Sequence, residues 1–358
     1  MQNIYRVLAI NPGSTSTKIG VYENDQLLFE QVDRYTSEEL SAYKGVIDQY
    51  EFRKNGIMEL LDKQGIALQS LDAVVGRGGL LKPLPSGTFQ VNELMLADLK
   101  GETRGSHASN LGGLLAGELA GEAGIPAFIV DPVVVDELDP VARITGRPEI
   151  LRRCIFHALN HKAAAKRLAK EMNRSYEEMN LVVAHLGGGI SIGCHKQGRI
   201  VEVNNCLDGD GPFAPERAGT VQAKQFAEII LKEGWNLGQV SAALAGQAGL
   251  VAHLGTNDAR KVEEMIAGGN EKARLVYDAM IYQVSRYIAA AAVSVQGKVD
   301  YIILTGGIAY SKYLTDKIKA DVQFIAPVII MPGEDELRAL AEGAFRVLSG
   351  EEEAKVYV

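Results

Sequence analysis

A loop near the N-terminus, NPGSTSTK, holds the first residues whose types and spacing could do chemistry. Gly13 lets a ligand approach the backbone closely, the hydroxyl groups of residues 14–16 can donate to phosphate oxygens, and Lys18 adds a point charge. A Walker A loop is excluded, because that loop needs GxxxxGK[ST] followed by a helix, and residues 19–22 resume strand-like sequence. The loop therefore predicts either a phosphate-binding turn between two strands or an ordinary hairpin turn at a sheet edge.

A second loop, HLGGGIS at residues 185–191, repeats this design. In both loops an apolar strand ends at a polar residue, Asn11 or His185, and a bend of small residues leads into another apolar strand. Further along the chain, DAVVGRGG (72–79) and DYIILTGG (300–307) match in the same order. Elements that recur in the same order predict two related domains, with a ligand cleft between the halves.

Two arginines stand in glycine-rich surroundings. Arg77, in VVGRGG, ends an expected strand, and Arg217, in APERAGT, lies in an expected loop after GDG. A guanidinium group can bind a carboxylate or a phosphoryl group through two parallel hydrogen bonds, so both side chains are candidates for holding anions. A surface salt bridge is the alternative for each.

Three histidines are candidates for a catalytic or ligand role. His157 and His161 lie four residues apart in an expected helix, a spacing that could present two metal ligands on one face. The residues between them lack the glutamate of HExxH, which excludes a zinc-protease site, and we expect His161 to be structural. His107, in GSHASNLGG, is the third candidate.

Carboxylates and glycines at expected element ends complete the set. Asp131 ends the strand AFIVD, where α/β enzymes often place functional groups. Thr305-Gly306-Gly307 ends the strand YIIL, where glycines let a ring or a ribose lie against the backbone. MPGEDELRAL carries three acidic residues, 334–336, at an expected helix start, where acidic residues also complement the helix dipole.

Alternating strands and helices must position these residues. Strand-like runs (VLAI, AVVG, AFIV, LVVAHL, YIILTGG, APVIIM) alternate with helical stretches such as GGLLAGELAGEAG and ILRRCIFHALNHKAAAKRLAKEM. This alternation predicts an α/β fold with mixed sheets flanked by helices. The Pro- and Gly-bearing stretch 131–149 is the best candidate for a domain boundary.

The composition is that of a soluble globular protein of about two domains, with 358 residues, 47% of them hydrophobic and 23% charged. The net charge of -8, without a basic block, argues against a nucleic-acid partner. Cys154, Cys194 and Cys206 show no CxxC spacing, which is typical of a reducing cytosol. No apolar stretch reaches the ~20 residues of a membrane span. We therefore expect a cytoplasmic protein without a membrane partner.

NPGSTSTK, HLGGG and TGG, in this order, resemble the two phosphate loops and the adenosine loop of the acetate and sugar kinase, chaperone ATPase and actin superfamily. INPGSTSTKIGVYEN, VVGRGGLLKPLPSGTF, FHALNH, DGDGPFAPERAGT and MPGEDELRALAEGA are similar to the acetate kinase family of short-chain acyl kinases, and the later stretches favour its butyrate branch. The similarity covers nearly the whole chain. It implies two duplicated actin-like (ribonuclease H-like) α/β domains, residues 1–148 and the nucleotide-binding 149–336, with a nucleotide cleft between them. A C-terminal helix, 337–358, is expected to pack back on the first domain.

The resemblance also implies an activity. It is the reversible, ATP-dependent phosphorylation of a short-chain carboxylate, butyrate or a branched analogue, to an acyl phosphate by direct in-line transfer. The implied cofactors are ATP and Mg²⁺. The implied partners are the acid, its acyl phosphate, ATP and ADP, and the expected assembly is a homo-oligomer. A carboxylate nucleophile is already deprotonated, so the chemistry needs positioning and fixed cations rather than a general base.

Site residues carry over from the positions that match the family. The expected catalytic residues are Arg77, Arg217, His157, Asp131 and Asn11. The residues expected to bind the substrate and its phosphate are Ser14, Ser16, Lys18 and His107. The residues expected to bind the nucleotide are His185, Gly187, Gly188, Gly189, Asp258, Arg260, Thr305, Gly306 and Gly307; for Asp258, a helix N-terminus is an equal explanation. The expected magnesium ligands are Asn11, Asp335 and Glu336, of which the last two align with the family's acidic pair.

Three stretches depart from the acetate enzymes. HLGGG stands in place of HLGNG, TGGIAYS in place of GGIGEN, and FHALNH in place of FHGTSH. These departures point away from an acetate kinase without defining the acid, because selectivity for one methylene amounts to only ~1–3 kcal/mol and depends on single pocket side chains. Two other functions stay open. A nucleotide-gated scaffold of the actin or chaperone type has no need for two arginines at a transfer point, and a phosphoanhydride hydrolase needs a carboxylate, such as Asp131, to activate water.

Overall fold

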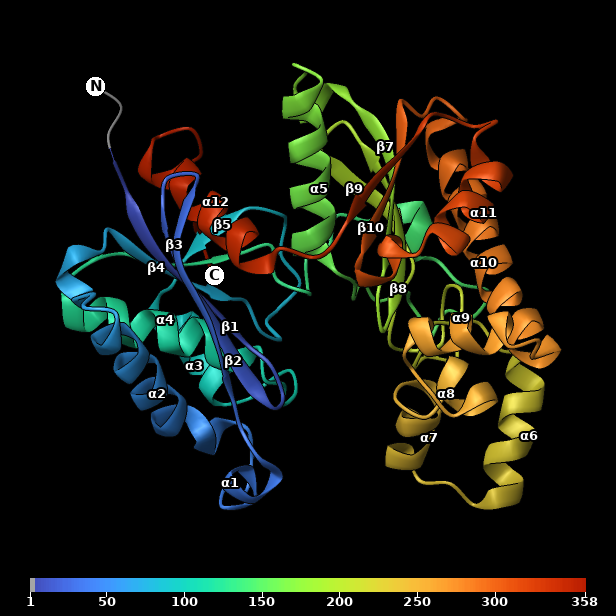
Figure 1. The fold of residues 1–358 in the computed structure, drawn as a ribbon, viewed down its shortest axis with the longest axis horizontal. Helices are drawn as coiled ribbons and strands as arrows, with labels where there is room; N and C mark the ends of the chain where they lie inside the picture. The colour runs from blue at the N-terminus through green and yellow to red at the C-terminus, as the bar shows by residue number, and fades with distance from the viewer. Residues whose placement is uncertain (1–3) are drawn as a thin grey trace. The chain divides into compact units, whose positions relative to one another are not determined.

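The computed structural model describes residues 4–358, which form two mixed sheets flanked by helices, as the sequence predicts (Figure 1). The chain divides into two compact units. The first holds the described residues up to Val135 together with Asp335–Val358, and the second holds Asp136–Glu334. The domain limits expected from the sequence, at residues 148 and 336, stay a prediction about folding domains.

The first unit is built on a 7-stranded sheet with the strand order β12-β5-β6-β4-β1-β2-β3. Its strands are β1 (Arg6–Pro12), β2 (Ser16–Glu23), β3 (Gln26–Arg34), β4 (Ala73–Arg77), β5 (Thr88–Gln90), β6 (Ala127–Val130) and β12 (Lys355–Val356). β1 pairs antiparallel with β2 and parallel with β4, and β4 pairs parallel with β6. The nearly continuous apolar sequences of β4 and β6 suit strands that are buried on both faces.

Two helices cover opposite faces of this sheet. Gly113 of α4 approaches Ile129, whereas Gly343 of α12 approaches Val130, and successive strand residues point to opposite faces (Figure 1). The helices of the unit are α1 (Ser37–Ser41), α2 (Tyr50–Lys63), α3 (Glu93–Lys100), α4 (Asn110–Ala123) and α12 (Glu336–Leu348), with two short 3-10 helices, η1 (Ile47–Gln49) and η2 (Leu68–Ser70).

The C-terminal segment differs from the single helix expected over 337–358. α12 ends at Leu348, Gly350 adopts a φ of 78°, and residues 355–356 form β12, which pairs parallel with β5. A left-handed glycine after the last turn ends a helix, because it takes the backbone out of the right-handed region. Before that point, α12 packs against β1, β2 and β4.

The second unit is built on a 5-stranded sheet with the strand order β11-β10-β7-β8-β9. Its strands are β7 (Asn180–Leu186), β8 (Ile190–Lys196), β9 (Arg199–Val203), β10 (Tyr301–Gly306) and β11 (Val328–Pro332). Leu181 and Val183 of β7 pack with α5, whereas Val182 and Ala184 pack with α10, so these helices cover opposite faces (Figure 1).

The helices of the second unit are α5 (Ala158–Glu171), α6 (Ala223–Glu233), α7 (Leu237–Leu244), α8 (Gly249–Leu254), α9 (Ala259–Ala267), α10 (Glu271–Ala292) and α11 (Lys312–Val322). Short 3-10 helices lie at η3 (Pro140–Arg143), η4 (Tyr176–Glu178), η5 (Val293–Val295) and η6 (Gly307–Tyr310). Across residues 4–358, no helix combines the length and the apolar character that crossing a bilayer requires.

The two sheets share one topology. The order β6-β4-β1-β2-β3 of the first unit repeats as β11-β10-β7-β8-β9 in the second, with parallel β1/β4 and β7/β10 pairs and antiparallel β1/β2 and β7/β8 pairs. Ala9 pairs with Gly20, and Val183 pairs with Gly193, so Asn11 and His185 occupy equivalent positions two residues further along. The duplication predicted from the sequence is therefore confirmed.

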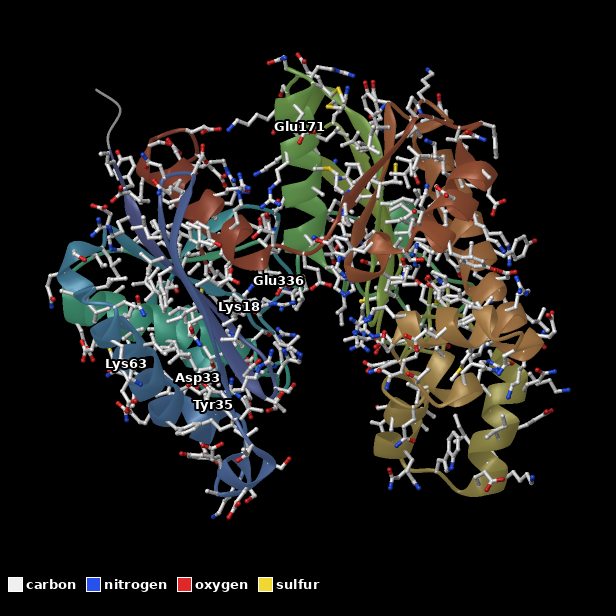
Figure 2. All side chains as sticks on the ribbon, viewed as in Figure 1. Lys18, Asp33, Tyr35, Lys63, Glu171 and Glu336 are labelled. Carbon is white, nitrogen blue, oxygen red and sulfur yellow. The ribbon has the colours of Figure 1, made fainter. Side chains whose placement is uncertain are left out.

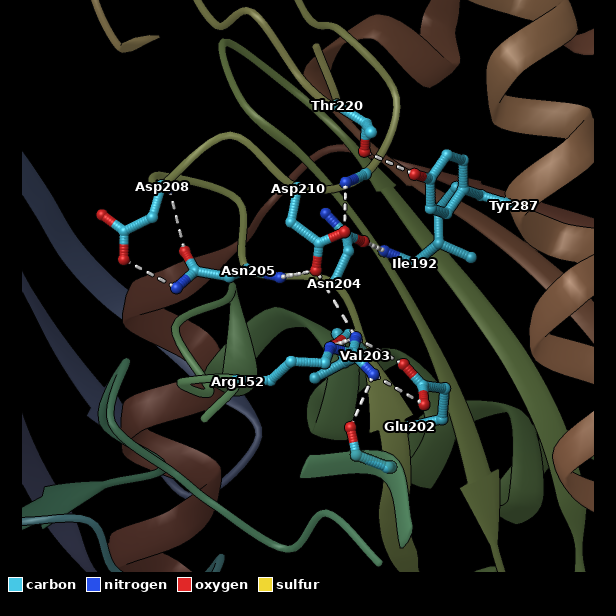
Figure 3. Close-up of polar contacts among 12 residues, drawn as sticks. Arg152, Ile192, Glu202, Val203, Asn204, Asn205, Asp208, Asp210, Thr220 and Tyr287 are labelled. Carbon is cyan, nitrogen blue, oxygen red and sulfur yellow. Dashed lines mark hydrogen bonds and ion pairs between the residues drawn. The ribbon is translucent and has the colours of Figure 1, made fainter. Parts of the chain in front are cut away.

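The helix expected to begin near residue 150 begins at Ala158 instead, and His157 is its N-cap residue. Residues 150–157 are held by other contacts: Leu151 forms a bridge with Ile144, and Arg152 binds the carboxylate of Glu202 at 2.6 Å (Figure 3). These long-range contacts replace the local helical hydrogen bonds that the sequence pattern predicts. His157 and His161 therefore do not present two ligands from one helix face.

Candidate active site

The NPGSTSTK loop is the turn of the β1–β2 hairpin. Asn11 pairs with Lys18 across the hairpin, and within the turn the N–H of Gly13 donates to the carbonyl of Ser16 at 2.8 Å. The ammonium group of Lys18 pairs with Glu30 of β3 at 2.8 Å (Figure 2). The polar turn lies between two strands, as both sequence interpretations require, and its lysine already has an acidic partner.

A buried arginine that the sequence did not single out holds this turn from behind. Arg53 of α2 is 0% exposed. Its guanidinium donates to three backbone carbonyls at 2.8–3.1 Å, those of Gly13, Ser14 and Ser16. The same guanidinium donates to the side-chain oxygens of Thr17 and Gln49. The carbonyl oxygens of the turn are therefore directed toward the protein interior.

Every hydrogen-bond acceptor of Arg53 is neutral. Burial lowers the pKa of this guanidinium, while Tyr35 and Asp33 raise it. The ring of Tyr35 lies 4.8 Å from the guanidinium carbon. Because arginine remains charged in proteins, it contributes positive potential to the turn. Arg53, Ile57 and Leu61 are the buried residues of α2 at spacing i, i+4 and i+8, and this spacing is the sequence signal that could have revealed it.

Asn11, Arg77 and Glu336 meet in the first unit. Arg77, the last residue of β4, contacts the carboxylate of Glu336 at 3.0 Å and Oδ1 of Asn11 at 3.3 Å. The side-chain amide of Asn11 donates to the same carboxylate. The side chains of Arg77 and Glu336 are 25% and 19% exposed. The fold thus brings together three predicted site residues, from β1, β4 and the first turn of α12.

This cluster also tests the fit of the predicted magnesium ligands. The carboxylate of Glu336 and the amide oxygen of Asn11 are hard oxygen donors, and Mg²⁺ usually keeps several waters and takes only one or two carboxylates. Their chemistry fits the ion, although both groups now contact Arg77. Within the described part of the chain, no group of three or more His, Cys, Asp or Glu side chains forms a metal site. Asp335 occupies the N-cap position of α12 with a φ of 27°.

Two further predicted residues of the first unit contact neighbouring backbone. Oδ1 of the buried Asp131 accepts from the hydroxyl of Ser86 at 2.6 Å and from the N–H of Gly87 at 2.8 Å. Nδ1 of the exposed His107 accepts from the N–H of Ser109 at 3.1 Å. Asp131 therefore anchors a loop, and His107 is held before the start of α4.

In the second unit, His157 and His185 lie face to face, with ring centres 3.8 Å apart and planes inclined by 15°. Nδ1 of His185 donates to the side-chain oxygen of Asn160 at 2.8 Å, because an amide oxygen only accepts. Nε2 of His185 lies 3.4 Å from the carboxylate of Glu334. The N-cap and first turn of α5 thus position the pair.

A row of buried side chains continues from His157. Oγ of Ser191 lies 2.8 Å from Nδ1 of His157 and 3.0 Å from Nε2 of His161. Nδ1 of His161 lies 3.3 Å from Nε2 of His195, whose Nδ1 lies 2.8 Å from the hydroxyl of Tyr176. His161, expected to be structural, is therefore linked to His157 through one hydroxyl group.

Arg217 lies over the glycine turn of the β7–β8 hairpin. Its guanidinium donates to the carbonyl of Cys206 at 2.9 Å. The guanidinium also occupies the space that a Cβ on Gly189 would need, so this position of HLGGGIS requires glycine. The N–H of Glu216 donates to the carbonyl of Gly188 at 3.3 Å, which ties the arginine-bearing loop to the turn.

The remaining nucleotide-side candidates lie at two other places in the second unit. Thr305 and Gly306 end β10, and Gly307 begins η6. Gly306 adopts a φ of 91° and exchanges backbone hydrogen bonds with Gly333 at 3.0 and 3.1 Å. A Cβ on Gly306 would overlap the backbone of β7. Asp258 caps α9 and pairs with the exposed Arg260 at 2.9 Å. Helix capping thus accounts for Asp258, and the nucleotide role of both residues stays a prediction.

Comparison with known proteins identifies similar chains. Residues 141–325 match the acetokinase family. The structure is similar to the acetate kinase of Porphyromonas gingivalis, with a TM-score of 0.79 and 18% identity, covering 95% of this chain and 99% of that one. It is similar to a propionate kinase of Francisella tularensis, with a TM-score of 0.74, 18% identity and coverage of 94% and 98%. The acetate kinase of Entamoeba histolytica gives 0.75, 16% identity and coverage of 95% and 99%. These matches confirm the predicted actin-like α/β fold class.

Proposed function

The chain belongs to the acetokinase family, and we propose that it transfers the γ-phosphoryl group of ATP reversibly to the carboxylate of a short-chain acid of the butyrate type. The coarser activity, ATP-dependent phosphorylation of a carboxylate to an acyl phosphate, follows from the family. The identity of the acid and the roles of individual residues are what we propose.

The observation that carries the proposal is the placement of Arg217 over the turn of HLGGGIS. The guanidinium fills the space above Gly189 and is fixed by the carbonyl of Cys206. A charged side chain held at a glycine turn is suited to an anionic phosphoryl group. A protein that only binds nucleotide as a scaffold does not need this cation.

Because the carboxylate of the acid and the γ-phosphoryl group of ATP are both anions, the chain must supply fixed positive charge and hydrogen-bond donors to bring them together. We assign Arg77 to the carboxylate of the acid and Arg217 to the phosphoryl group in transfer. His157 then donates a hydrogen bond to an equatorial phosphoryl oxygen. In the first unit, Arg53 contributes positive charge behind the Ser14 and Ser16 hydroxyls, which we assign to the acid and phosphoryl side.

Glu336 and Asn11 are the residues that would hold Mg²⁺, which neutralises charge on the β- and γ-phosphates when it is bound. Because Arg77 contacts both groups, their carboxylate and amide oxygens are held in one place before any ion binds. This arrangement supports a role for Glu336 and Asn11 beside the arginine that we assign to the acid.

The butyrate class rests on the sequence departures at HLGGG, TGGIAYS and FHALNH. Loss of the asparagine side chain at Gly188 leaves the turn with backbone donors alone. The solved relatives reported above are acetate and propionate kinases, so an acid panel decides this part of the proposal. The hydrolase alternative loses support, because the carboxylate of Asp131 is buried and engaged by Ser86 and Gly87.

The experiment is a hydroxylamine trap with Mg-ATP and straight and branched acids from C2 to C6. The proposal expects acyl hydroxamate and ADP in equal amounts, with the highest kcat/KM for a four-carbon acid. Equal amounts of both products with the highest kcat/KM for acetate would support the kinase activity and reject the butyrate assignment. ADP without hydroxamate for every acid would reject the kinase.

A further inference from the structure

We infer that the buried side chains behind His157 decide which of its ring nitrogens carries the proton. The set comprises Ser191 and His195 on β8, His161 on α5, and Tyr176 on η4. The packing that allows it depends on a glycine: between Ser191 and His195, Gly193 leaves room for the ring of His161, whose Nδ1 would lie 3.3 Å from an added Cβ. His161 can therefore reach both neighbours on the strand.

Both inner histidines are neutral. Burial, with the nearby His185 and Lys162, lowers the pKa of His161 to about 3. Burial, with His161 and Lys162, holds the pKa of His195 well below its ordinary value. A neutral imidazole has one N–H donor and one acceptor nitrogen. Each ring in the row must therefore accept from one neighbour and donate to the other.

A serine hydroxyl can also accept from two donors, but Ser191 is 0% exposed, and if both histidines donated to it, its own hydrogen would have no acceptor among the contacts of the described residues. Two arrangements satisfy every group of the row. In the first, the hydroxyl of Tyr176 donates to His195, His195 donates to His161, His161 donates to Ser191, and Ser191 donates to Nδ1 of His157. In the second, every hydrogen bond is reversed, and His157 donates from Nδ1. The direction of the row and the tautomer of His157 are therefore the same variable.

The hydrogen bond between Tyr176 and His195, at the end of the row away from His157, favours the first arrangement. A phenol, with a pKa of about 10, is a much stronger acid than a neutral imidazole N–H, and an imidazole nitrogen is a better acceptor than a phenol oxygen. The ammonium group of Lys162 lies 5.5 Å from the ring centre of Tyr176 and pairs with Glu137 at 2.7 Å. This cation strengthens the phenol as a donor. Tyr176 thus donates into the row.

The consequence reaches His157. Its Nδ1 accepts from Ser191, so the proton of the neutral ring lies on Nε2. Protonation of Nδ1 would break that hydrogen bond or reverse the whole row. The groups on this side include His185, stacked at 3.8 Å, and Glu334, which lies 3.4 Å from Nε2 of His185. The neutral ring of His157 therefore presents Nε2–H as its donor.

Ser191, His161, His195 and Tyr176 are positioning residues, because they act through His157. The use of the Nε2–H group toward a phosphoryl oxygen rests on the proposed function. The tautomer itself does not, because it follows from contacts within the second unit. A spectroscopic test can therefore fail or succeed independently of turnover.

The test is ¹⁵N NMR of the full-length protein labelled at histidine, which has six such residues. His157→Gln identifies the signals of His157. At pH 7 the neutral ring of His157 in the wild-type protein is expected to be the Nε2–H tautomer. Tyr176→Phe removes the donor at the head of the row while it keeps the ring. We expect this variant to populate the Nδ1–H form of His157, because the reversed row no longer competes with the donor hydroxyl of Tyr176.

The matched control is Tyr277→Phe, which removes another buried tyrosine hydroxyl in this unit, bound to Glu263 at 3.1 Å. The control is expected to leave the His157 signals unchanged. Ser191→Ala gives a second test if Tyr176→Phe does not fold, because loss of the hydroxyl that donates to Nδ1 of His157 must also populate the Nδ1–H form. A wild-type His157 whose neutral ring carries its proton on Nδ1 at pH 7 would overturn the inference. So would a Tyr176→Phe variant whose His157 behaves as in the control.

Discussion

Replacement of Arg53 by methionine is expected to destabilise the first unit through the NPGSTSTK turn. Methionine keeps an unbranched apolar stem in the buried site and removes all the guanidinium donors. Arg53 is 0% exposed, so water cannot readily replace its hydrogen bonds to the carbonyls of Gly13 and Ser16 at 2.8 and 2.9 Å. The loss therefore falls on the backbone of the turn.

The magnitude can be worked from these partners. The carbonyl of the exposed Ser14 can turn to water, and the carbonyl of Ser16 keeps the N–H of Gly13 as a donor. The carbonyl of Gly13 and the buried side-chain oxygen of Gln49 lose their donor, at about 1–3 kcal/mol each. Removal of the desolvated cation returns part of this loss. A net cost of about 3 kcal/mol is expected, which for a unit of this size lowers Tm by roughly 6–12 °C. Arg53→Lys is expected to lose about half as much, because an ammonium group has fewer donors and no planar fork.

The assay is thermal unfolding, with hydrogen exchange of residues 13–17 to locate the change. The matched control is Arg338→Met, which removes a half-exposed arginine of the same unit that pairs only with Glu342 along α12, at 3.0 Å. The control is expected to change stability by about 0.5 kcal/mol or less. The reasoning is refuted if Arg53→Met unfolds at the same temperature as Arg338→Met, or if exchange in the turn does not accelerate.

Two further predictions concern the second unit. Gly189→Ala places a methyl group in the space of the Arg217 guanidinium and is expected to lower kcat by a factor of about 10²–10³, as for a lost donor to developing negative charge. In the control Gly146→Ala, the added methyl group meets no atom within 4 Å, and kcat should be unchanged. Equal kcat values for the two variants would contradict this prediction. In the unfolded chain His161 and His195 take up a proton near pH 6.5, whereas in the folded chain their pKa values are lowered, to about 3 for His161. The free energy of unfolding therefore falls as the pH drops below 6.5, by up to about 1.4 kcal/mol per histidine per pH unit. Tm at pH 7 and pH 5.5 measures this loss, and an unchanged Tm would show that the rings are not held neutral.

The repeated strand–turn–strand units could be predicted because each is local in sequence. Apolar runs ending at Asn11 and His185, followed by small residues, determine the hairpins, and the matching runs before Arg77 and Gly306 determine the parallel neighbours. The helix boundaries could not be predicted as well. Residues 150–157 contact distant residues such as Glu202, and such contacts override the local helical pattern.

The candidate site was predictable only where side chains carry the chemistry. Asn11, Arg77 and Glu336 follow from the family resemblance, and the fold brings them together. Arg53 could not be found in this way, because its main partners are backbone carbonyls, which leave no mark in a sequence. The row behind His157 was missed for a similar reason: Tyr176 and His195 look like ordinary core residues until the fold aligns their polar atoms.

The central claim is that the phosphoryl group passes to a carboxylate oxygen and not to water. Butyrate labelled with ¹⁸O at both carboxylate positions tests it directly, with Mg-ATP, hydroxylamine and ³¹P NMR of the released phosphate. Hydroxylamine attacks the acyl carbon, so phosphate formed through an acyl phosphate keeps the bridging oxygen of the acid. We expect phosphate that carries one ¹⁸O atom in amounts equal to the hydroxamate. Phosphate that carries no ¹⁸O would show transfer to water and contradict the account.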